Sequence, residues 1–541
     1  MSVVVGIDLG TTNSVVSYLK RGRAEVIPID GKNIFPSVLS IRDGEIIVGS
    51  QAKARMMLSP ETSVCSTKRD MGKDITYDLG TEMFTPEDVA YYILKTIKEK
   101  AGGILGEKID QAVITVPAYF TSEQREATKR AAERAGLNVL RLMPEPTAAA
   151  LDYGIDQQRD QIIMVYDLGG GTFDISIMKV DKNEFEVLAV DGNSRLGGDD
   201  FDELICKKMY DKINDELGED ITSKKDKKYI SALMKIRENA EKAKVDLSDL
   251  EEVEIIIPNL IDDYSFEMTL TRDEFNQLIE PLMEETIDKI YNALRLANLT
   301  KDDIDRVLLV GGSTKMPIVK EKVRDSIKDP YVAPNVDEVV SRGAAIMAAS
   351  LCVPETYDMS SQTSSEVNRT NEVNRVNEIN GVNLDKKIIV KEKVVFTYGI
   401  DMLDENRKLY FRSIIKRGST LPAKGAVLGY TSTPLQKSVV ITIYRGESKS
   451  VKENQYLGEL ELDIVNVSEK NVPVCALFEI DENMIITFTS IEIPMTEEYR
   501  ELMDSAGNDG GNMDVDLINK CLLEGKLKGK KIEIDAKAHL K

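Results

Sequence analysis

Two stretches of this sequence follow one pattern, Gly6-Ile7-Asp8-Leu9-Gly10-Thr11-Thr12-Asn13-Ser14 and Asp167-Leu168-Gly169-Gly170-Gly171-Thr172-Phe173-Asp174. In each stretch the first aspartate follows an apolar run of buried-strand length, residues 3–7 for the first and 162–166 for the second. The glycines let the backbone point its N–H groups at an anion, and the threonine hydroxyls are further donors. A single copy is more simply an ordinary β-turn. Two copies predict a duplicated hairpin that holds one polyphosphate from both sides.

The composition limits the classes of protein to which the chain can belong. Its 541 residues are too many for one core and indicate about two to four domains, which a hydrophobic fraction of 42% can fill. The formal net charge of -22 argues against nucleic acid and membrane surfaces as partners, because both attract clustered Lys and Arg. The single histidine, His539, argues against a His-dependent triad or metal site.

The cysteines and the apolar segments indicate a compartment. Five cysteines stand far apart without a CxxC pair, which favours a reducing environment. The N-terminus enters a strand without a signal-like apolar core, and no apolar stretch reaches membrane-spanning length. We therefore expect a cytoplasmic protein.

Several residues between the two turns have local roles but no function that spacing alone reveals. Thr121 and Gln124 form a capping-box pattern for a helix that we expect to end at Gly136. Glu145 stands between two prolines at the start of an Ala-rich helix, where it is either a helix-start acid or a rigidly held functional group. Lys68 lies in a loop, where a lysine is ordinarily a solvated charge.

Three features follow the second turn. Gly197 and Gly198 open a helix with acids in its first turn, and such a helix start can approach phosphate. Residues 231–248 have one apolar stripe at helical spacing, beside a polar face of Glu241, Lys244 and Ser248 that is normally just solvated. A third strand-to-glycine turn, Gly311-Gly312-Ser313-Thr314-Lys315, lacks the leading aspartate.

The last third of the chain changes character. Three short polar repeats at 366–383 cannot build a core and indicate a flexible linker within 354–393. Residues 394–495 alternate apolar and polar residues in short runs, which predicts an antiparallel β-sandwich. We expect a short tail at 496–541 with at most two short helices.

These motifs resemble the seventy-kilodalton heat-shock chaperones of the DnaK type, and most closely their short HscC-like branch. The resemblance covers residues 1 to about 350. It is carried by both Asp-Leu-Gly turns, Thr115-Val116-Pro117-Ala118-Tyr119-Phe120, Glu145-Pro146-Thr147-Ala148-Ala149-Ala150 and Val310-Gly311-Gly312-Ser313-Thr314. It implies an α/β, actin- and hexokinase-like two-lobed ATPase domain at 1–353. The β-sandwich would bind peptide, and the long helical lid would be absent or truncated. No GxxxxGK[ST] loop is present.

The resemblance also implies roles for individual residues around ATP or ADP, Mg2+ and, as a further candidate ion, K+. The implied catalytic residues are Lys68, Glu145, Asp167 and Thr172, and the implied metal-site residues are Asp8, Asp167 and Asp174. The implied nucleotide-binding residues are Gly10, Thr11, Thr12, Asn13, Gly169, Gly170, Gly171, Gly197, Gly198, Glu241, Lys244, Ser248, Gly311, Gly312, Ser313 and Lys315.

The chain departs from the family pattern at a few positions. Lys315 stands where many members have an arginine that stacks on adenine, and lysine lacks that planar surface. Arg195 replaces a common histidine. Lys391 interrupts the apolar linker patch of Ile388, Ile389 and Val390, which puts coupling between the domains in doubt.

The resemblance implies an ATP-dependent chaperone of protein folding and the stress response that hydrolyses ATP and binds extended hydrophobic segments of unfolded polypeptides. By its position in the chain, Val439 is the residue that the resemblance implies for the peptide-binding pocket. A J-domain co-chaperone and a nucleotide exchange factor are the implied partners. The alternative is a nucleotide-binding regulator of another chaperone with little productive ATPase cycling. A sugar kinase of the same superfamily is disfavoured, because the C-terminal half lacks a kinase-like lobe.

Overall fold

The computed structural model describes residues 2–80, 82–154, 160–224, 226–352, 388–404, 406–506 and 512–533. The chain divides into two compact units, residues 1–120 with 128–390 and residues 121–127 with 391–541. The polar repeats at 366–383 lie outside the described residues, so their prediction as a linker stays a prediction. None of the described helices combines the length and apolarity that crossing a bilayer requires.

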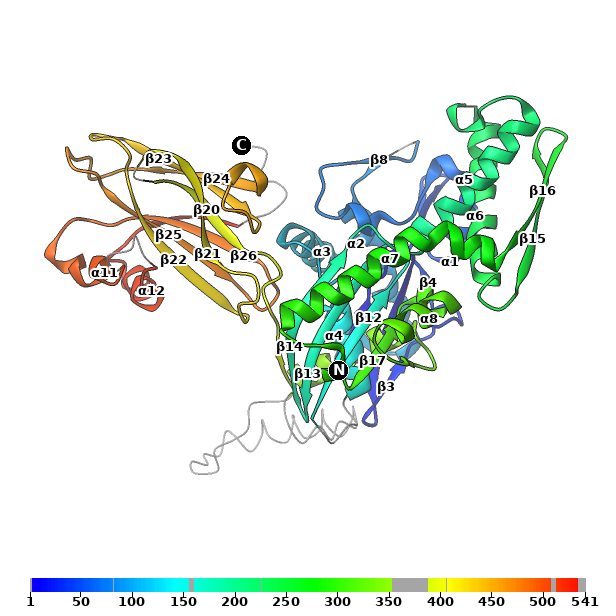
Figure 1. The fold of residues 1–541 in the computed structure, drawn as a ribbon, viewed down its shortest axis with the longest axis horizontal. Helices are drawn as coiled ribbons and strands as arrows, with labels where there is room; N and C mark the ends of the chain where they lie inside the picture. Colours follow the sequence, from blue (N-terminus) through cyan, green and yellow to red (C-terminus); the bar gives the residue numbers. More distant parts are fainter. Residues whose placement is uncertain are drawn as a thin grey trace. The chain divides into compact units, whose positions relative to one another are not determined.

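The first unit contains two sheets of the same topology, one for each copy of the sequence pattern (Figure 1). In each sheet an antiparallel three-strand meander is continued by two strands that run parallel to its first strand. The first sheet has the order β11-β10-β1-β2-β3, formed by Asn138–Pro144, Lys108–Val116, Ser2–Asp8, Asn13–Lys20 and Arg23–Val26. The second has the order β18-β17-β12-β13-β14, formed by Tyr331–Val332, Arg306–Val310, Gln161–Leu168, Phe173–Asp181 and Glu184–Asn193. The duplicated hairpin that the sequence predicts is present.

Two helices connect these sheets through very close packing. Helix α9 (Val339–Leu351) packs on β1 and β2, α4 (Glu145–Gly154) packs on β12 and β13, and the two helices pack on each other. A Cβ at Gly343 would lie 1.8 Å from the backbone oxygen of Ala148, and one at Gly6 would lie 2.1 Å from the backbone nitrogen of Ala345. Glycine is required at both positions, because any side chain would force the elements apart.

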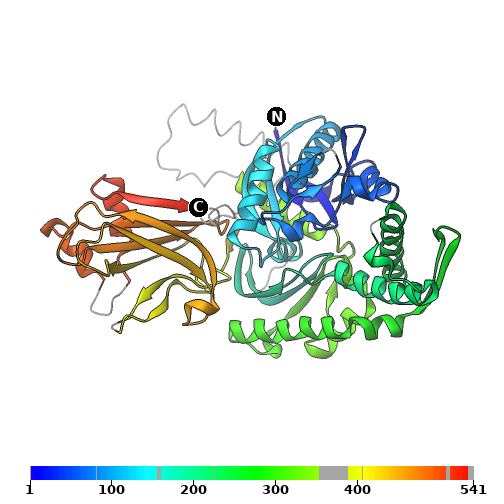
Figure 2. The same cartoon turned by 90° about the horizontal axis from the view of Figure 1, so that it is seen from above.

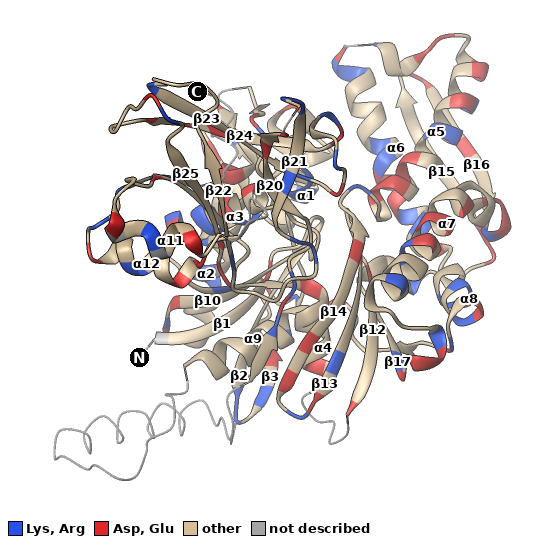
Figure 3. Cartoon of the chain, turned by 60° about the vertical axis from the view of Figure 1, so that its left-hand side comes forward, with Lys and Arg blue, Asp and Glu red and all other residues tan. Residues whose placement is uncertain are grey.

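Helices on either side of the sheets complete the first unit. Helix α2 (Pro86–Leu105) packs on β10, and α7 (Arg272–Ala297) packs on β13 and β14. Helices α5 (Gly198–Leu217) and α6 (Lys227–Asp246) lie beside the hairpin of β15 (Glu252–Ile261) and β16 (Tyr264–Thr271) (Figures 1 and 2). The predicted apolar stripe of α6 is confirmed: Ile236, Ala240 and Ala243 are buried in this core. In Figure 3, both acidic and basic positions are coloured along the ribbons of these helices.

The second unit is a β-sandwich of two antiparallel sheets. One sheet has the order β21-β20-β23-β24, formed by Leu409–Ile415, Tyr398–Leu403, Ser438–Arg445 and Gln455–Asp463. The other has the order β22-β25-β26-β27, formed by Ala423–Tyr430, Pro473–Ile480, Ile486–Glu492 and Gly529–Glu533. The first residues of α3 (Ser122–Arg134) are grouped with this unit, and the predicted capping box is present: Thr121 N donates to Gln124 Oε1 at 3.0 Å.

The described part of the predicted tail belongs to the sandwich. Helices α11 (Arg500–Asp504) and α12 (Val515–Leu523) bury Leu502 and Ile518 in a core shared with Leu477 of β25. Strand β27, drawn in red in Figure 2, then pairs with β26 and becomes an edge of the sheet. The boundary expected at residue 496 therefore lies inside a compact unit, because local sequence could not show which sheet the last strand would join.

The apolar linker patch begins as part of the first unit. Ile388 is buried and its backbone N–H donates to Ser350 Oγ at 2.9 Å, while Ile389 N donates to the backbone oxygen of Asn183 at 2.9 Å. Strand β19 (Ile389–Lys391) thereby follows β14 at the edge of the second sheet. Lys391, which interrupts the apolar pattern, does not prevent this pairing.

Candidate functional site

A cavity of about 500 Å³ lies between the two hairpin turns of the first unit. This volume is in the range of small-molecule and cofactor sites. The predicted residues that line it are Asp8, Gly10, Thr11, Thr12, Asn13, Lys68, Glu145, Asp167, Gly169, Gly170, Thr172, Glu241, Lys244, Ser248, Gly311, Gly312, Ser313 and Lys315. The predicted residues Gly171, Asp174, Gly197 and Gly198 do not line it.

The turns contact each other directly, and glycine makes that contact possible. A Cβ at Gly170 would lie 2.1 Å from Thr12 Oγ1, and a Cβ at Gly171 would lie 2.6 Å from Thr11 Cγ2. Behind the second turn, Gly198 N donates to the backbone oxygen of Gly169 at 3.0 Å, which brings the start of α5 against it. Gly171 and Gly198 therefore shape the site without lining it.

Four carboxylates gather at the ends of the central strands. Asp8 Oδ1 accepts from Thr115 Oγ1 at 2.9 Å, and Asp174 Oδ1 accepts from Tyr119 N at 3.1 Å. Burial raises the pKa of Asp8 and of Asp174 to about 7, and the negative charge of Glu145 acts in the same direction on both. Burial and the neighbouring Glu145 hold the pKa of Asp167 well above its usual range. A bound cation would reverse this repulsion and favour the ionised carboxylates.

Lys68 and Glu145 form a buried ion pair in this acidic environment. Lys68 Nζ lies 2.5 Å from Glu145 Oε1, and the two residues are 5% and 9% exposed. Lys68 comes from a short 3-10 turn, Thr67–Asp70, whereas Glu145 begins α4. The two residues are 77 positions apart, so only the fold brings them together.

The carboxylates suit a magnesium ion that arrives with a polyphosphate. Among the described residues, no group of three or more His, Cys, Asp or Glu side chains could hold a metal alone. Asp174 Oδ2 is buried and has no hydrogen-bond partner in the described part of the chain. Mg2+ usually keeps several waters and binds one or two carboxylates together with substrate phosphates. Asp8 and Asp167, which line the cavity, fit that requirement, and the unpartnered Asp174 Oδ2 belongs to the residue paired with Asp167 on the next strand.

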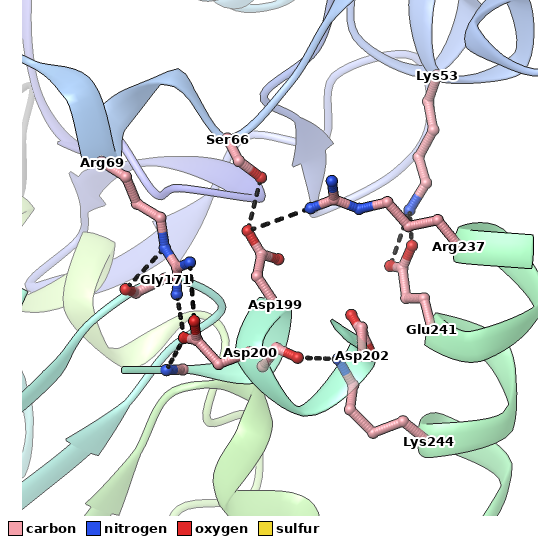
Figure 4. Close-up of polar contacts among 12 residues, drawn as sticks. Lys53, Ser66, Arg69, Gly171, Asp199, Asp200, Asp202, Arg237, Glu241 and Lys244 are labelled. Atoms are coloured by element: carbon pink, nitrogen blue, oxygen red, sulfur yellow. Dashed lines mark hydrogen bonds and ion pairs between the residues drawn. The ribbon is translucent and has the colours of Figure 1, made fainter. Parts of the chain in front are cut away.

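Sequence reasoning missed a set of ion pairs and hydrogen bonds that link residues 53–69, α5 and α6 to one another (Figure 4). Arg69 pairs with Asp200, and its Nε donates to the backbone oxygen of Gly171 at 2.9 Å. Ser66 Oγ donates to Asp199 Oδ2 at 2.7 Å. The further pairs are Arg237–Asp199 at 3.8 Å and Lys53–Glu241 at 2.9 Å. The acids at the start of α5 were visible in the sequence, but their partners lie far away in the chain and carry no local signal.

Glu241 and Lys244 of α6 line the cavity, together with Ser248 beyond the end of the helix. Lys244 Nζ lies 2.7 Å from Asp202 Oδ1 and donates to the backbone oxygen of Gly198 at 3.1 Å. Burial raises the pKa of Asp202 to about 6, against the opposing effect of the Lys244 charge.

Two departures from the family pattern have partners of their own. Lys315 Nζ pairs with Asp337 at 2.5 Å, and both residues line the cavity. Arg195 lies 3.8 Å from Asp70 and does not line the cavity. The departure at Lys315 therefore lies inside the cavity, whereas the departure at Arg195 lies outside it.

The duplicated α/β sheets, with a cavity of about 500 Å³ between their hairpin turns, define an actin-like nucleotide-binding protein, here followed in the chain by a β-sandwich. Residues 4–79, 74–360 and 378–526 match the family model described as Hsp70 protein. The chain belongs to the Hsp70 family.

Membership of this family establishes the general function. Hsp70 proteins are ATP-dependent chaperones that bind ATP or ADP with Mg2+. They bind unfolded polypeptides and work with J-domain and nucleotide-exchange co-chaperones. The more specific HscC-like branch stays a prediction from the sequence.

Proposed function

We propose that this chain hydrolyses ATP in the cleft of its first unit and binds extended hydrophobic polypeptide segments on its β-sandwich. The observation that carries the proposal is the buried Lys68–Glu145 pair, which lies at the cavity between the two hairpin turns. A cation beside carboxylates that can position water is what phosphoryl transfer to water requires.

The residues of the cleft have different roles in hydrolysis. Lys68 supplies positive charge at the terminal phosphate, and the Thr172 hydroxyl is a further donor to it. Glu145 and Asp167 accept hydrogen bonds from the attacking water and hold it in line with the bond that breaks. Asp8 and Asp174 would help to hold Mg2+, which neutralises charge on the phosphates when it is bound.

The other end of the cavity supplies the groups for adenosine. Glu241 and Lys244 lie on α6, Ser248 follows the end of that helix, and Lys315 lies on the third glycine turn. Lys53 and Asp202 hold Glu241 and Lys244 in place. The Lys53–Glu241 pair also joins α6 to α1 (Ser50–Met56).

Peptide binding is supported by apolar residues on one sheet of the sandwich. Val439 is half-buried and pairs with Leu462, on the same side of β23 as the buried Ile441. Leu403, Val440 and Tyr456 on the same sheet are exposed large apolar residues. Strand β19 at the edge of the second sheet provides a route by which nucleotide binding could be communicated along the chain.

Steady-state ATPase measurements with and without a hydrophobic peptide test this proposal. We expect Lys68→Ala and Thr172→Ala each to lower kcat by about 100-fold, while the protein still binds ATP. Lys320→Ala and Thr96→Ala are matched controls, because Lys320 is exposed on α8 (Pro317–Ser326) and Thr96 Oγ1 bonds to Tyr92 within α2.

The outcomes separate the candidate functions. Stimulation of hydrolysis by the peptide supports a chaperone cycle. Tight ATP binding by the unmodified chain without turnover would support a regulator of another chaperone and overturn the ATPase. Unchanged rates in both cleft variants would remove Lys68 and Thr172 from the mechanism.

A further inference from the structure

A second cavity of about 430 Å³ lies in the first unit, on the other side of the chain segment 333–342 from the nucleotide cleft. It is lined by the end of α4, by β17 and β18, and by the first turn of α9. Helix α4 and strand β17 can be found in Figure 1. Its volume lies within the range of small-molecule sites. None of the predicted nucleotide or catalytic residues lines it.

The side chains of this cavity offer an aromatic wall and a positive charge that no described side chain pairs with. The rings of Tyr153 and Tyr331 lie 5.2 Å apart between centroids, at an angle of 54°. Arg342 is already held by Asp152 at 2.8 Å and by Glu338 at 3.2 Å. Arg306 also lines the cavity and is exposed, and its guanidinium group makes no ion pair or hydrogen bond with any described residue.

These groups select one class of ligand. Aromatic side chains favour a flat ring through stacking or edge contacts, and guanidinium is a strong partner for carboxylate, sulfonate or phosphate. Asp152 and Glu338 pair with Arg342, so among the described residues that line the cavity the unpaired positive charge is that of Arg306. The complementary ligand is therefore a small aromatic anion.

The two cavities share their walls, so a ligand in one can act on the other. From the segment 333–342, Val336, Asp337 and Val340 line the nucleotide cleft, whereas Pro334, Val339 and Arg342 line the second cavity. Helix α4 likewise begins with Glu145 in the cleft and ends with Asp152 and Tyr153 in the second cavity. Strand β17 ends with Val310 in the second cavity, directly before Gly311 in the cleft.

We propose that this second cavity binds a small aromatic anion and that its occupancy changes nucleotide affinity. The displacement of Asp337 carries the effect, because Asp337 holds Lys315 at the nucleotide site. Coupling between two sites is reciprocal, so nucleotide must change the affinity of the anion by the same factor.

Calorimetric titration of the full chain with naphthalene-2-sulfonate tests the site. We expect Arg306→Gln to weaken binding of this probe about tenfold, since one charged hydrogen bond is lost. Tyr331 lies at an exposed position on an edge strand. Tyr331→Ser removes one of the two rings of the aromatic wall and should independently weaken binding of the probe. Lys320→Gln is the matched control, because it removes an exposed cation of the same unit that lines neither cavity. Probe binding that is undiminished in both Arg306→Gln and Tyr331→Ser would overturn the site.

Titration with ADP in the presence and absence of saturating probe tests the coupling. We expect the ADP affinity to change by at least about fivefold, and Arg306→Gln to need about tenfold more probe for half of that change. Equal ADP affinities with and without bound probe would overturn the coupling. Because probe binding is measured without ATP turnover, failure of the proposed ATPase would leave this test intact.

Discussion

The turn after β1 carries Thr11 and Thr12, whereas the matching turn after β12 carries Gly170 and Gly171. The two hairpins share strand order and direction, yet one turn supplies side chains and the other supplies the space that these side chains enter. Two identical threonine turns could not approach as closely, because their side chains would collide. The copies therefore fit together because their sequences differ.

The strands after the turns differ in a second way. Asp8 pairs in register with Val15 in the first hairpin, whereas Asp167 pairs with Asp174 in the second. The second hairpin therefore brings two buried carboxylates side by side, and the first brings only one. We expect charge repulsion between these two carboxylates to lower the stability of the ligand-free protein at neutral pH.

The strongest test of the comparison is to put a side chain on the glycine turn. Gly170→Ala places a methyl group where Thr12 Oγ1 lies, so we expect the turns to separate and ADP affinity to fall about 10- to 100-fold. Titration calorimetry measures this loss.

A neighbouring glycine provides the control for that change. A Cβ at Gly169 would have its nearest neighbour at 3.7 Å, an ordinary contact, so Gly169→Ala should bind ADP almost as the unmodified chain does. Equal losses in the two variants would show that the turn needs glycine for backbone reasons and not for the contact with Thr12.

Removing the charge of the extra carboxylate in the second hairpin should have an effect of intermediate size, on the unfolding temperature. The pKa of Asp174 is raised to about 7 in the folded protein. Between the usual pKa of an aspartate and about 7, its carboxyl group is therefore protonated in the folded state but ionised in the unfolded state. The contribution of this group to stability is therefore greatest at low pH and declines as the pH rises toward 7. Asp174→Asn should raise the unfolding temperature of the ligand-free protein by about 2–4 °C at about pH 8, and by less at about pH 5.

Scanning calorimetry at the two pH values measures this difference. Asp191→Asn is a suitable control, because Asp191 is buried on the neighbouring strand but has Lys289 at 3.4 Å and Asn292 as partners. Its neutralisation should lower the unfolding temperature instead. A lower unfolding temperature for Asp174→Asn at about pH 8 would contradict the view that the second hairpin stores charge repulsion.

The smallest expected effect lies outside both hairpins. Lys315→Arg keeps a positive charge beside Asp337 and adds a planar group that can stack on a base, so ATP affinity should rise about two- to fivefold. A fluorescent-nucleotide displacement assay measures it, with Lys320→Arg as the surface control. Unchanged affinity would show that Lys315 does not face the base, and that the hairpins and α6 account for nucleotide binding.

Several elements of the fold could be predicted from the sequence because their signals are local. The apolar runs before each Asp-Leu-Gly turn became β1 and β12, and the Thr121–Gln124 pattern became the cap of α3. The apolar stripe of α6 and the alternation of the sandwich strands were likewise readable from periodicity. Repetition of one turn predicted the duplicated hairpin, since a shared pattern implies a shared local structure.

Only the tertiary structure decided which side chains meet. Lys68 carries no local mark that distinguishes it from a surface lysine, and it becomes part of the site because the fold places it against Glu145. Arg69 meets Asp200 from 131 positions away, and Lys315 finds Asp337 on a different segment. The second cavity and the place of β27 in the sandwich have the same origin. The sequence by itself determined the turns, caps and strands, because these depend on neighbouring residues, whereas pairing across the cleft depends on long-range packing.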